Sequence, residues 1–222
     1  MKNSALYESF YRSLKLAEKD NIEPNGMMEL PKKNVETDSS APAGTKEMVL
    51  KTLDELQSAK AHPDENKGTL GDFDINSLPL IDVVKQLKVD VIKASVRGRA
   101  SYNPVHKTIE IGGNRSKQTF LHELAHAVDD ILLYRKDITW FEETVAELSA
   151  VVLCKTYSIP FSISHSKCYL VKYIPTWIWI YTTERINAIN RVVEIVDYIK
   201  QCKMAIDSES VPPCYIGRLS LP

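Results

Sequence analysis

Cysteine is scarce in this sequence, and its spacing limits the kinds of site that the chain can form. The chain has four cysteines, and none of them belongs to a C-x-x-C pair: Cys154, Cys168, Cys202 and Cys214. A zinc ribbon is therefore not indicated. Free thiols are the normal state of cysteine in a reducing compartment, so we expect a cytoplasmic protein with unpaired cysteines.

The chain also lacks an excess of charge of either sign. Lys and Arg number 28 and Asp and Glu number 29, which gives a formal net charge of −1 at pH 7. General affinity for nucleic acid depends on basic side chains that neutralise phosphates. The composition therefore disfavours a nucleic-acid partner.

Long apolar runs are missing as well. The first residues lack the continuous apolar stretch of a secretory signal, which again favours the cytoplasm. Residues 169–181 are apolar and aromatic, but Lys172, Pro175 and a length below about 18 residues argue against a membrane span. We interpret this segment as packing in the core or over a site, with a surface for a peptide or partner as the alternative.

A pentapeptide carries the clearest chemical signal. His122-Glu123-Leu124-Ala125-His126 is an H-E-x-x-H motif set in an apolar pattern that predicts a helix over about 117–133, with Ser116 near its start. Two imidazoles at i and i+4 share one helix face and can reach a single Zn²⁺. Glu123 is rotated by about 100° from His122, so it can address a water molecule rather than the metal. The alternative is a helix with two ordinary histidines.

A second helix is expected to supply the third metal ligand. Thr139 and Glu142 have the spacing of a capping box, which predicts a helix from 140 to about 157. Glu143 and Glu147 lie one turn apart, where two carboxylates repel each other unless a cation or a donor lies between them. We predict that Glu143 is the third ligand and that Glu147 accepts the N–H of a ligating histidine. The exchanged assignment and an exposed acidic face both remain open.

These two motifs resemble those of a known family. The run T-F-L-H-E-L-A-H at 119–126, followed by E-E-T-V-A-E-L-S-A at 142–150, resembles the zincin-like metallopeptidase domain of ArdC-type antirestriction proteins and, more distantly, the ImmA/IrrE metallopeptidases. Residues 100–111 resemble the strand pair that precedes the metal helix, and 169–174 and 183–204 resemble the C-terminal helices. The resemblance covers about residues 78–204. It implies an α+β zincin-like metallopeptidase fold and an origin in a phage or another mobile element.

The resemblance also implies a substrate-binding strand. In such folds the last strand before the metal helix runs beside the cleft. We therefore expect an extended substrate to pair with this strand. The residues concerned are Thr108, Ile109, Glu110, Ile111 and Gly112.

The chain is long enough for one core and an appended arm. We predict a polar, partly disordered N-terminal extension over 1–75, with short helices such as 48–61, and a catalytic domain over 76–222. A loosely docked arm is the expected state of the extension. Within the catalytic domain we expect a helix at 79–87, strands near 91–96, 99–102 and 107–111, and a long helix at 183–204.

The predicted activity is zinc-dependent hydrolysis of peptide bonds in a limited set of cytoplasmic proteins. His122, His126 and Glu143 hold Zn²⁺, and Glu123 moves a proton from the attacking water to the leaving amine. Four side chains could assist as oxyanion donors and are not ranked: Tyr157, His165, Tyr169 and Tyr173. The alternative is a zincin-fold binding, regulatory or antirestriction protein that lacks catalysis and acts by contact with a host protein or nucleic acid.

Overall fold

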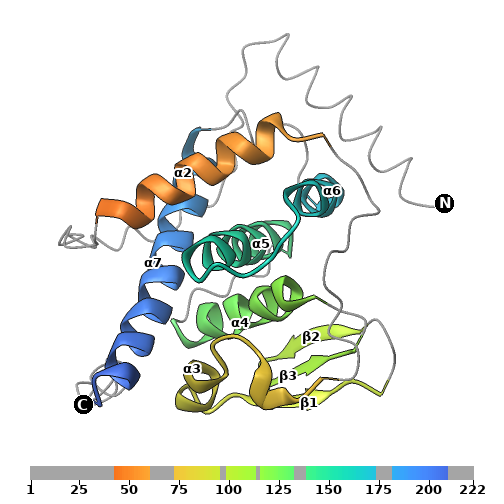
Figure 1. Ribbon diagram of the computed structural model, residues 1–222. Coiled ribbons are helices and arrows are strands. Elements are labelled where there is room, and N and C mark those ends of the chain that lie inside the picture. Colours follow the sequence, from red (N-terminus) through yellow and green to blue (C-terminus); the bar gives the residue numbers. More distant parts are fainter. Residues whose placement is uncertain are drawn as a thin grey trace, which may run out of the picture. The chain divides into compact units, whose positions relative to one another are not determined.

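The computed structural model describes residues 43–60, 73–95, 99–113, 116–132, 139–173 and 182–209. In chain order the elements are α2 (Ala43–Ser58), η1 (Ile75–Ser77), α3 (Ile81–Gln86), β1 (Asp90–Lys93), β2 (Ala100–Asn103), β3 (Thr108–Ile111), α4 (Lys117–Ile131), α5 (Thr139–Thr156), α6 (Ile163–Tyr173) and α7 (Thr182–Asp207). The class is α+β, with a small mixed sheet and mostly helices, as predicted (Figure 1). In these ranges no helix has the length and apolarity needed to cross a membrane. The predictions for 1–42, 174–181 and Cys214 lie outside the described residues.

The helices predicted from the sequence within the described residues are present, although the one predicted at 48–61 is found at 43–58 as α2. Helices α4, α5 and α7 begin within one residue of the predicted positions. Helix α3 is shorter than predicted, because Leu80 just before it adopts a left-handed φ of 57° that a regular helix cannot include. Thr139, predicted as the cap of α5, is instead its first helical residue.

The three strands form one sheet in the order β1-β3-β2. Strand β1 runs parallel to β3, whereas β2 runs antiparallel to it. The β2–β3 hairpin turns at Asn103, whose Oδ1 accepts hydrogen bonds from the backbone N–H groups of Val105 and His106 at 3.0 and 3.2 Å. Asparagine favours turns because its side chain can bond its own backbone a few residues further on. This turn, stabilised by the Asn103 side chain, allows β2 and β3 to pair although only a short loop joins them.

Strand β3 occupies the centre of the sheet, and this position overturns one prediction. Ile109 and Ile111 are fully buried, so the predicted alternation along the strand is confirmed. Both edges of β3 are taken, one by β1 and the other by β2. Gly112 just beyond it also donates its N–H to the Arg99 carbonyl at 2.8 Å. The topology therefore contradicts the prediction that 108–112 pairs with substrate, because its backbone groups are already bonded within the sheet.

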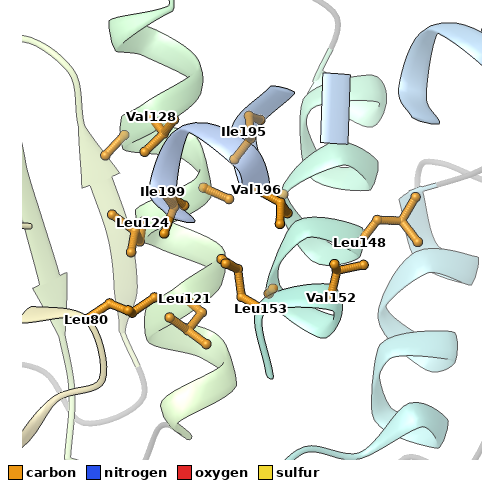
Figure 2. Close-up of a cluster of buried hydrophobic side chains, with 14 of the residues drawn as sticks. Leu80, Leu121, Leu124, Val128, Leu148, Val152, Leu153, Ile195, Val196 and Ile199 are labelled. Atoms are coloured by element: carbon orange, nitrogen blue, oxygen red, sulfur yellow. The ribbon is translucent and has the colours of Figure 1, made fainter. Parts of the chain in front are cut away.

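Helices α4, α5 and α7 enclose the hydrophobic core. Helix α4 lies between the sheet and α5 in Figure 1, and α7 packs against both helices. Figure 2 shows the converging side chains: Leu121, Leu124 and Val128 from α4, Leu148, Val152 and Leu153 from α5, and Ile195, Val196 and Ile199 from α7. Their spacing is that of one helix face. Burial of each side chain contributes roughly 1.5–3 kcal/mol, so this interface fixes α4 relative to α5.

Helix α2 belongs to the same core although it lies in the predicted extension. Its residues Val49, Leu53 and Leu56 are buried at helical spacing, and it packs on α5, α6 and α7. Thr45 adds a buried polar link, because its Oγ1 donates to Asp197 Oδ1 at 2.7 Å. This helix is therefore not loosely docked. The division of the chain at residue 75 stays a prediction.

Three of the four cysteines fall within the described residues. Cys154 and Cys202 are buried and Cys168 is half-buried, and all three are free thiols, as predicted. Burial raises the pKa of the Cys154 thiol to about 12. A thiol that remains protonated at neutral pH is neither a nucleophile nor a metal ligand.

Candidate metal centre

Helix α4 brings two histidines together at one end of the α4–α5 interface. The helix begins after Ser116, whose Oγ accepts the backbone N–H of Thr119 at 3.1 Å, so the expected cap is present. His122 and His126 lie one turn apart, and their Nε2 atoms are 3.2 Å from each other. Their ring centroids are 4.8 Å apart. The pentapeptide thus turns both side chains toward one point.

Helix α5 places Glu143 at the same point. One carboxylate oxygen, Oε2, lies 3.2 Å from His122 Nε2, and the other, Oε1, lies 3.7 Å from His126 Nε2. Ligand atoms of the three residues all fall within 4.8 Å of one another. The structure therefore brings together the three side chains that the sequence proposed as ligands and forms a candidate metal site.

The donor set fits a small tetrahedral cation. Zinc binds imidazole nitrogen and carboxylate oxygen at about 2.0–2.2 Å, so two ligands at the tetrahedral angle lie roughly 3.3 Å apart. His122 Nε2 lies 3.2 Å from His126 Nε2 and 3.2 Å from Glu143 Oε2, close to this value, whereas His126 Nε2 lies 3.7 Å from the other carboxylate oxygen, Glu143 Oε1. Two imidazoles and one carboxylate also leave a fourth position open, which is the ligand set of catalytic rather than structural zinc.

Glu147 lies on the opposite side of the His122 ring. Its Oε2 is 2.9 Å from His122 Nδ1, and the side chain is buried. Burial raises the pKa of Glu147, but the hydrogen bond from His122 outweighs this effect, so that the pKa lies below its usual value. An ionised Glu147 fixes a hydrogen on Nδ1 and leaves Nε2 to face Glu143 and His126. The geometry favours Glu143 over Glu147 as the ligand.

His122 is therefore held by a carboxylate at each ring nitrogen. Burial lowers the pKa of His122, but the hydrogen bonds with Glu143 and Glu147 outweigh it and raise the pKa to about 10. Burial likewise raises the pKa of Glu143, whereas hydrogen bonds from His122, His126 and Tyr169 hold it well below its usual range. The two shifts describe one mutual interaction, in which the carboxylates stabilise a positive charge on His122 and the hydrogen-bond donors stabilise the negative charge on Glu143.

A cavity of about 440 Å³ opens beside the ligand atoms. It is bounded by β2, α4, α5 and Tyr169 of α6, and five of its lining residues are acidic: Glu123, Asp129, Asp130, Glu142 and Glu143. Glu123 is buried and accepts a hydrogen bond from the backbone N–H of Tyr102. Burial is the main cause that raises the pKa of Glu123. A raised pKa suits a carboxylate that must accept a proton and return it.

Among the candidate oxyanion donors whose side chains the structure describes, Tyr169 is the one that lines the cavity. Its hydroxyl donates to Glu143 Oε2 at 2.5 Å, and its ring meets the His122 ring edge to face, with centroids 5.2 Å apart. Tyr157 and His165 do not line the cavity. The side chain of Tyr173 lies outside the described residues.

The sequence did not single out several residues that shape the cavity. The Tyr102 hydroxyl donates to Asp130 Oδ2 at 2.9 Å and so ties β2 to α4. Asp129 forms a buried two-pronged ion pair with Arg191 of α7. Asp130 follows His126 by one helical turn, so the helix period could have indicated it. No local pattern connects Arg191 to Asp129, which lies far from it in the sequence.

No family model matches the chain, and no curated protein matches it. The chain is similar to crystal structures of the antirestriction protein ArdC from the R388 plasmid, one Mn(II)-bound and one metal-free, with 20% identity and TM-scores of 0.43 and 0.42. The matches cover 62% and 65% of this chain and 55% and 54% of ArdC, so the chain spans about half of that protein's length. ArdC is also the protein type that the two metal motifs resemble, and membership of that family stays a prediction.

Proposed function

We propose that the chain is a zinc-dependent metallopeptidase with a zincin-like H-E-x-x-H…E site. The observation that carries the proposal is that the cavity is lined both by a cluster of three possible metal ligands and by a separate carboxylate. Donor atoms of His122, His126 and Glu143 converge at one point, while Glu123 lines the same cavity without belonging to the ligand cluster. A hydrolytic metal site needs both parts, a three-ligand set and a separate base.

In this proposal His122, His126 and Glu143 hold the ion. Bound zinc supplies Lewis acidity, which polarises a carbonyl and makes water acidic enough to ionise near neutral pH. Glu147 keeps His122 in the tautomer that offers Nε2. Other divalent ions accept the same donors, and zinc is proposed because two imidazoles and one carboxylate suit it well.

Glu123 is the proposed proton carrier. Its carboxylate accepts a proton from the attacking water and gives that proton to the amine that leaves when the peptide bond breaks. The raised pKa and the buried position beside both histidines support this role. Tyr169 stands on the far side of Glu143 with its hydroxyl at the cavity, where it could steady the carbonyl oxygen as negative charge develops.

A peptide is the substrate that the cavity favours, and strand β2 is the proposed docking edge. The register pairs Arg99 with Gly112 through a hydrogen bond, so Ala100 and Tyr102 turn their backbone groups away from β3. This edge faces the cavity, as the bond from the Tyr102 N–H to Glu123 requires. An extended peptide could pair with the outward backbone groups of Ala100, whereas the Tyr102 N–H is taken by Glu123, and such a peptide would lie along the ligand cluster. The acidic lining repels the phosphates of nucleic acid.

The cellular location is part of the same proposal. Three free thiols in the described residues are compatible with a reducing compartment, and on this basis we propose the cytoplasm. The substrate would then be a limited set of cytoplasmic proteins that expose an extended segment.

Metal content and peptide cleavage test the proposal together. We expect about one zinc per purified chain by elemental analysis, lost in Glu143→Ala and retained in Glu123→Gln and in the control Glu110→Ala, whose side chain pairs with Arg99 on the sheet. Cleavage is assayed with a proteome-derived peptide library and mass spectrometry. Wild type and Glu110→Ala should cut peptides, whereas Glu123→Gln should not. A zinc-loaded Glu123→Gln variant that cleaves like wild type would show that Glu123 is not the base.

A further inference from the structure

Gln118 forms a buried polar junction one turn before His122. Its Nε2 donates to Glu147 Oε1 at 2.7 Å and to Ser166 Oγ at 2.6 Å. Its Oε1 accepts the backbone N–H of Ser162 at 3.3 Å. The relative solvent exposure of Gln118 is only 4%, so these contacts take the place of hydrogen bonds to water. Both amide hydrogens and the carbonyl are in use.

The junction holds the carboxylate that orients the metal-binding histidine. Glu147 receives Gln118 on Oε1 and His122 Nδ1 on Oε2, which fixes the carboxylate plane at both ends. Ser166, which is fully buried, also bonds Glu147. The reverse amide orientation of Gln118 would set its oxygen against a carboxylate, so the network allows one orientation.

The same junction anchors helix α6. Ser162 precedes the helix and Ser166 lies in its first turn, and both bond Gln118. One turn further along, Tyr169 donates to Glu143. Helix α6 therefore reaches the candidate site at two places, through Gln118 to Glu147 and through Tyr169 to Glu143. These two polar connections are enough to link the position of α6 to the site without an apolar contact between α6 and α4.

We propose that Gln118 is a positioning residue that couples the docking of α6 to the orientation of His122. This inference rests on the proposed metal site and adds a role for a residue outside it. If α6 and the ion share Gln118, each must favour the other: a docked α6 raises metal affinity, and a bound ion stabilises α6 by the same factor. Docking of α6 also places the Tyr169 hydroxyl at Glu143, so the coupling would link the position of Tyr169 to the orientation of His122.

Gln118→Leu removes the junction while nearly preserving volume. The matched control is Thr45→Val, which also removes a buried polar link between two helices but lies on α2 and contacts Asp197 and Lys200. Zinc affinity is measured by competition with a chromophoric chelator, and helix docking by hydrogen–deuterium exchange of residues 163–173. For Gln118→Leu we expect an affinity loss of about tenfold, the lower end for outer ligands, and faster α6 exchange. Thr45→Val should change neither value.

Two further measurements separate positioning from general loosening. The visible absorption of the Co²⁺-loaded protein reports the ligand geometry, and we expect it to change in Gln118→Leu and to match wild type in Thr45→Val. Ser166→Ala is a milder second variant, because it removes the Ser166 bonds to Gln118 and Glu147 but leaves the Gln118 bonds to Glu147 and to the Ser162 N–H. It should speed α6 exchange and weaken zinc binding by about twofold to fivefold, in the same direction as Gln118→Leu.

The outcomes are distinguishable. Wild-type affinity together with wild-type α6 exchange in Gln118→Leu overturns the positioning role, as does weaker zinc binding with unchanged α6 exchange, which would leave Gln118 acting on Glu147 alone. If Gln118→Leu does not fold, Ser166→Ala decides by the same two readouts. Wild-type protein that takes up neither zinc nor cobalt overturns the metal site itself, and the coupling with it.

Discussion

Helix α4 has two faces that are built on different principles. Toward α7 it offers Leu121, Leu124 and Val128 to an apolar core (Figure 2). Toward α6 it offers Gln118 and His122, each held by named polar partners. Dispersion contacts are numerous, non-directional and individually weak, so the apolar face defines a position through many neighbours. The polar face defines orientation through a few bonds, and the loss of one leaves a buried group without its partner.

The largest expected effect breaks the apolar face. Leu124→Ala should lower the free energy of unfolding by about 2–5 kcal/mol, because it removes buried methyl groups and leaves a cavity among three helices. Urea unfolding followed by circular dichroism measures this value. The molecules that remain folded should bind zinc with wild-type affinity. A tenfold weaker affinity in folded Leu124→Ala protein would show that the two faces are not independent.

The next effect breaks the polar face. Glu147→Ala should weaken zinc binding by about 10–100-fold, since His122 loses the carboxylate that fixes its tautomer. Competition titration with a chelator measures the affinity. Glu194→Ala on α7 is a control with the same chemical change away from the site. Equal affinity in Glu147→Ala and wild type would contradict the outer-ligand role and reopen the exchanged assignment of the two glutamates.

A third prediction sharpens the comparison by pH. The pKa of His122 is raised to about 10, so in the metal-free protein this ring carries a hydrogen on both nitrogens and a positive charge at neutral pH. Zinc takes only the neutral ring, so each ion bound should release one proton, and the association constant should rise about tenfold per unit between pH 6 and 8. Calorimetry in buffers of different ionisation enthalpy measures the number of protons released when zinc binds. An affinity that does not change with pH would contradict a protonated His122.

The same shift has a consequence for folding. The folded pKa of His122 lies above the value of 6.5 for a free side chain. Its contribution to stability is therefore complete below pH 6.5 and is lost as the pH rises toward about 10. The apolar face contains no group that titrates in this range. Metal-free protein should unfold at lower urea concentration at pH 9 than at pH 7.

The smallest effect should act on both faces equally. Ser116→Ala removes the cap of α4 and should cost about 1 kcal/mol of stability, because the N–H of Thr119 loses its acceptor. Ser116→Asp should retain most of the stability, since aspartate also caps. Thermal unfolding measures the loss, and zinc affinity of the folded protein should stay unchanged. A change in affinity without a change in stability would show that Ser116 acts on the site alone.

The sequence predicted α4 and its two histidines well because both signals are local. A helical periodicity and an i, i+4 pair are both determined by residues close together in the sequence, so neither depends on the rest of the fold. The placement of Glu143 beside the histidines was also predictable, since two carboxylates one turn apart need a positive or donating neighbour, and its role as a ligand stays a prediction. The structure brings all three side chains within reach of one point.

Features that depend on distant segments were missed. Strand order decided that β3 is central, and no period within 108–112 indicates which neighbours it has. Tyr169 could not be chosen among four candidates, because its place depends on how α6 docks. Gln118 looked like an ordinary polar residue near a helix start. Its partners Glu147 and Ser166 lie in two other helices.

The shortness of β2 limits what the protein can grip. The strand has four residues and spans about 14 Å, and the register turns the backbone groups of Ala100 and Tyr102 outward. One of those groups, the Tyr102 N–H, is already bonded to Glu123. On the proposed function, such an edge measures only three or four residues of a client chain. Strands already paired inside a folded protein could not pair with this edge, so the expected substrates are flexible loops and unfolded segments.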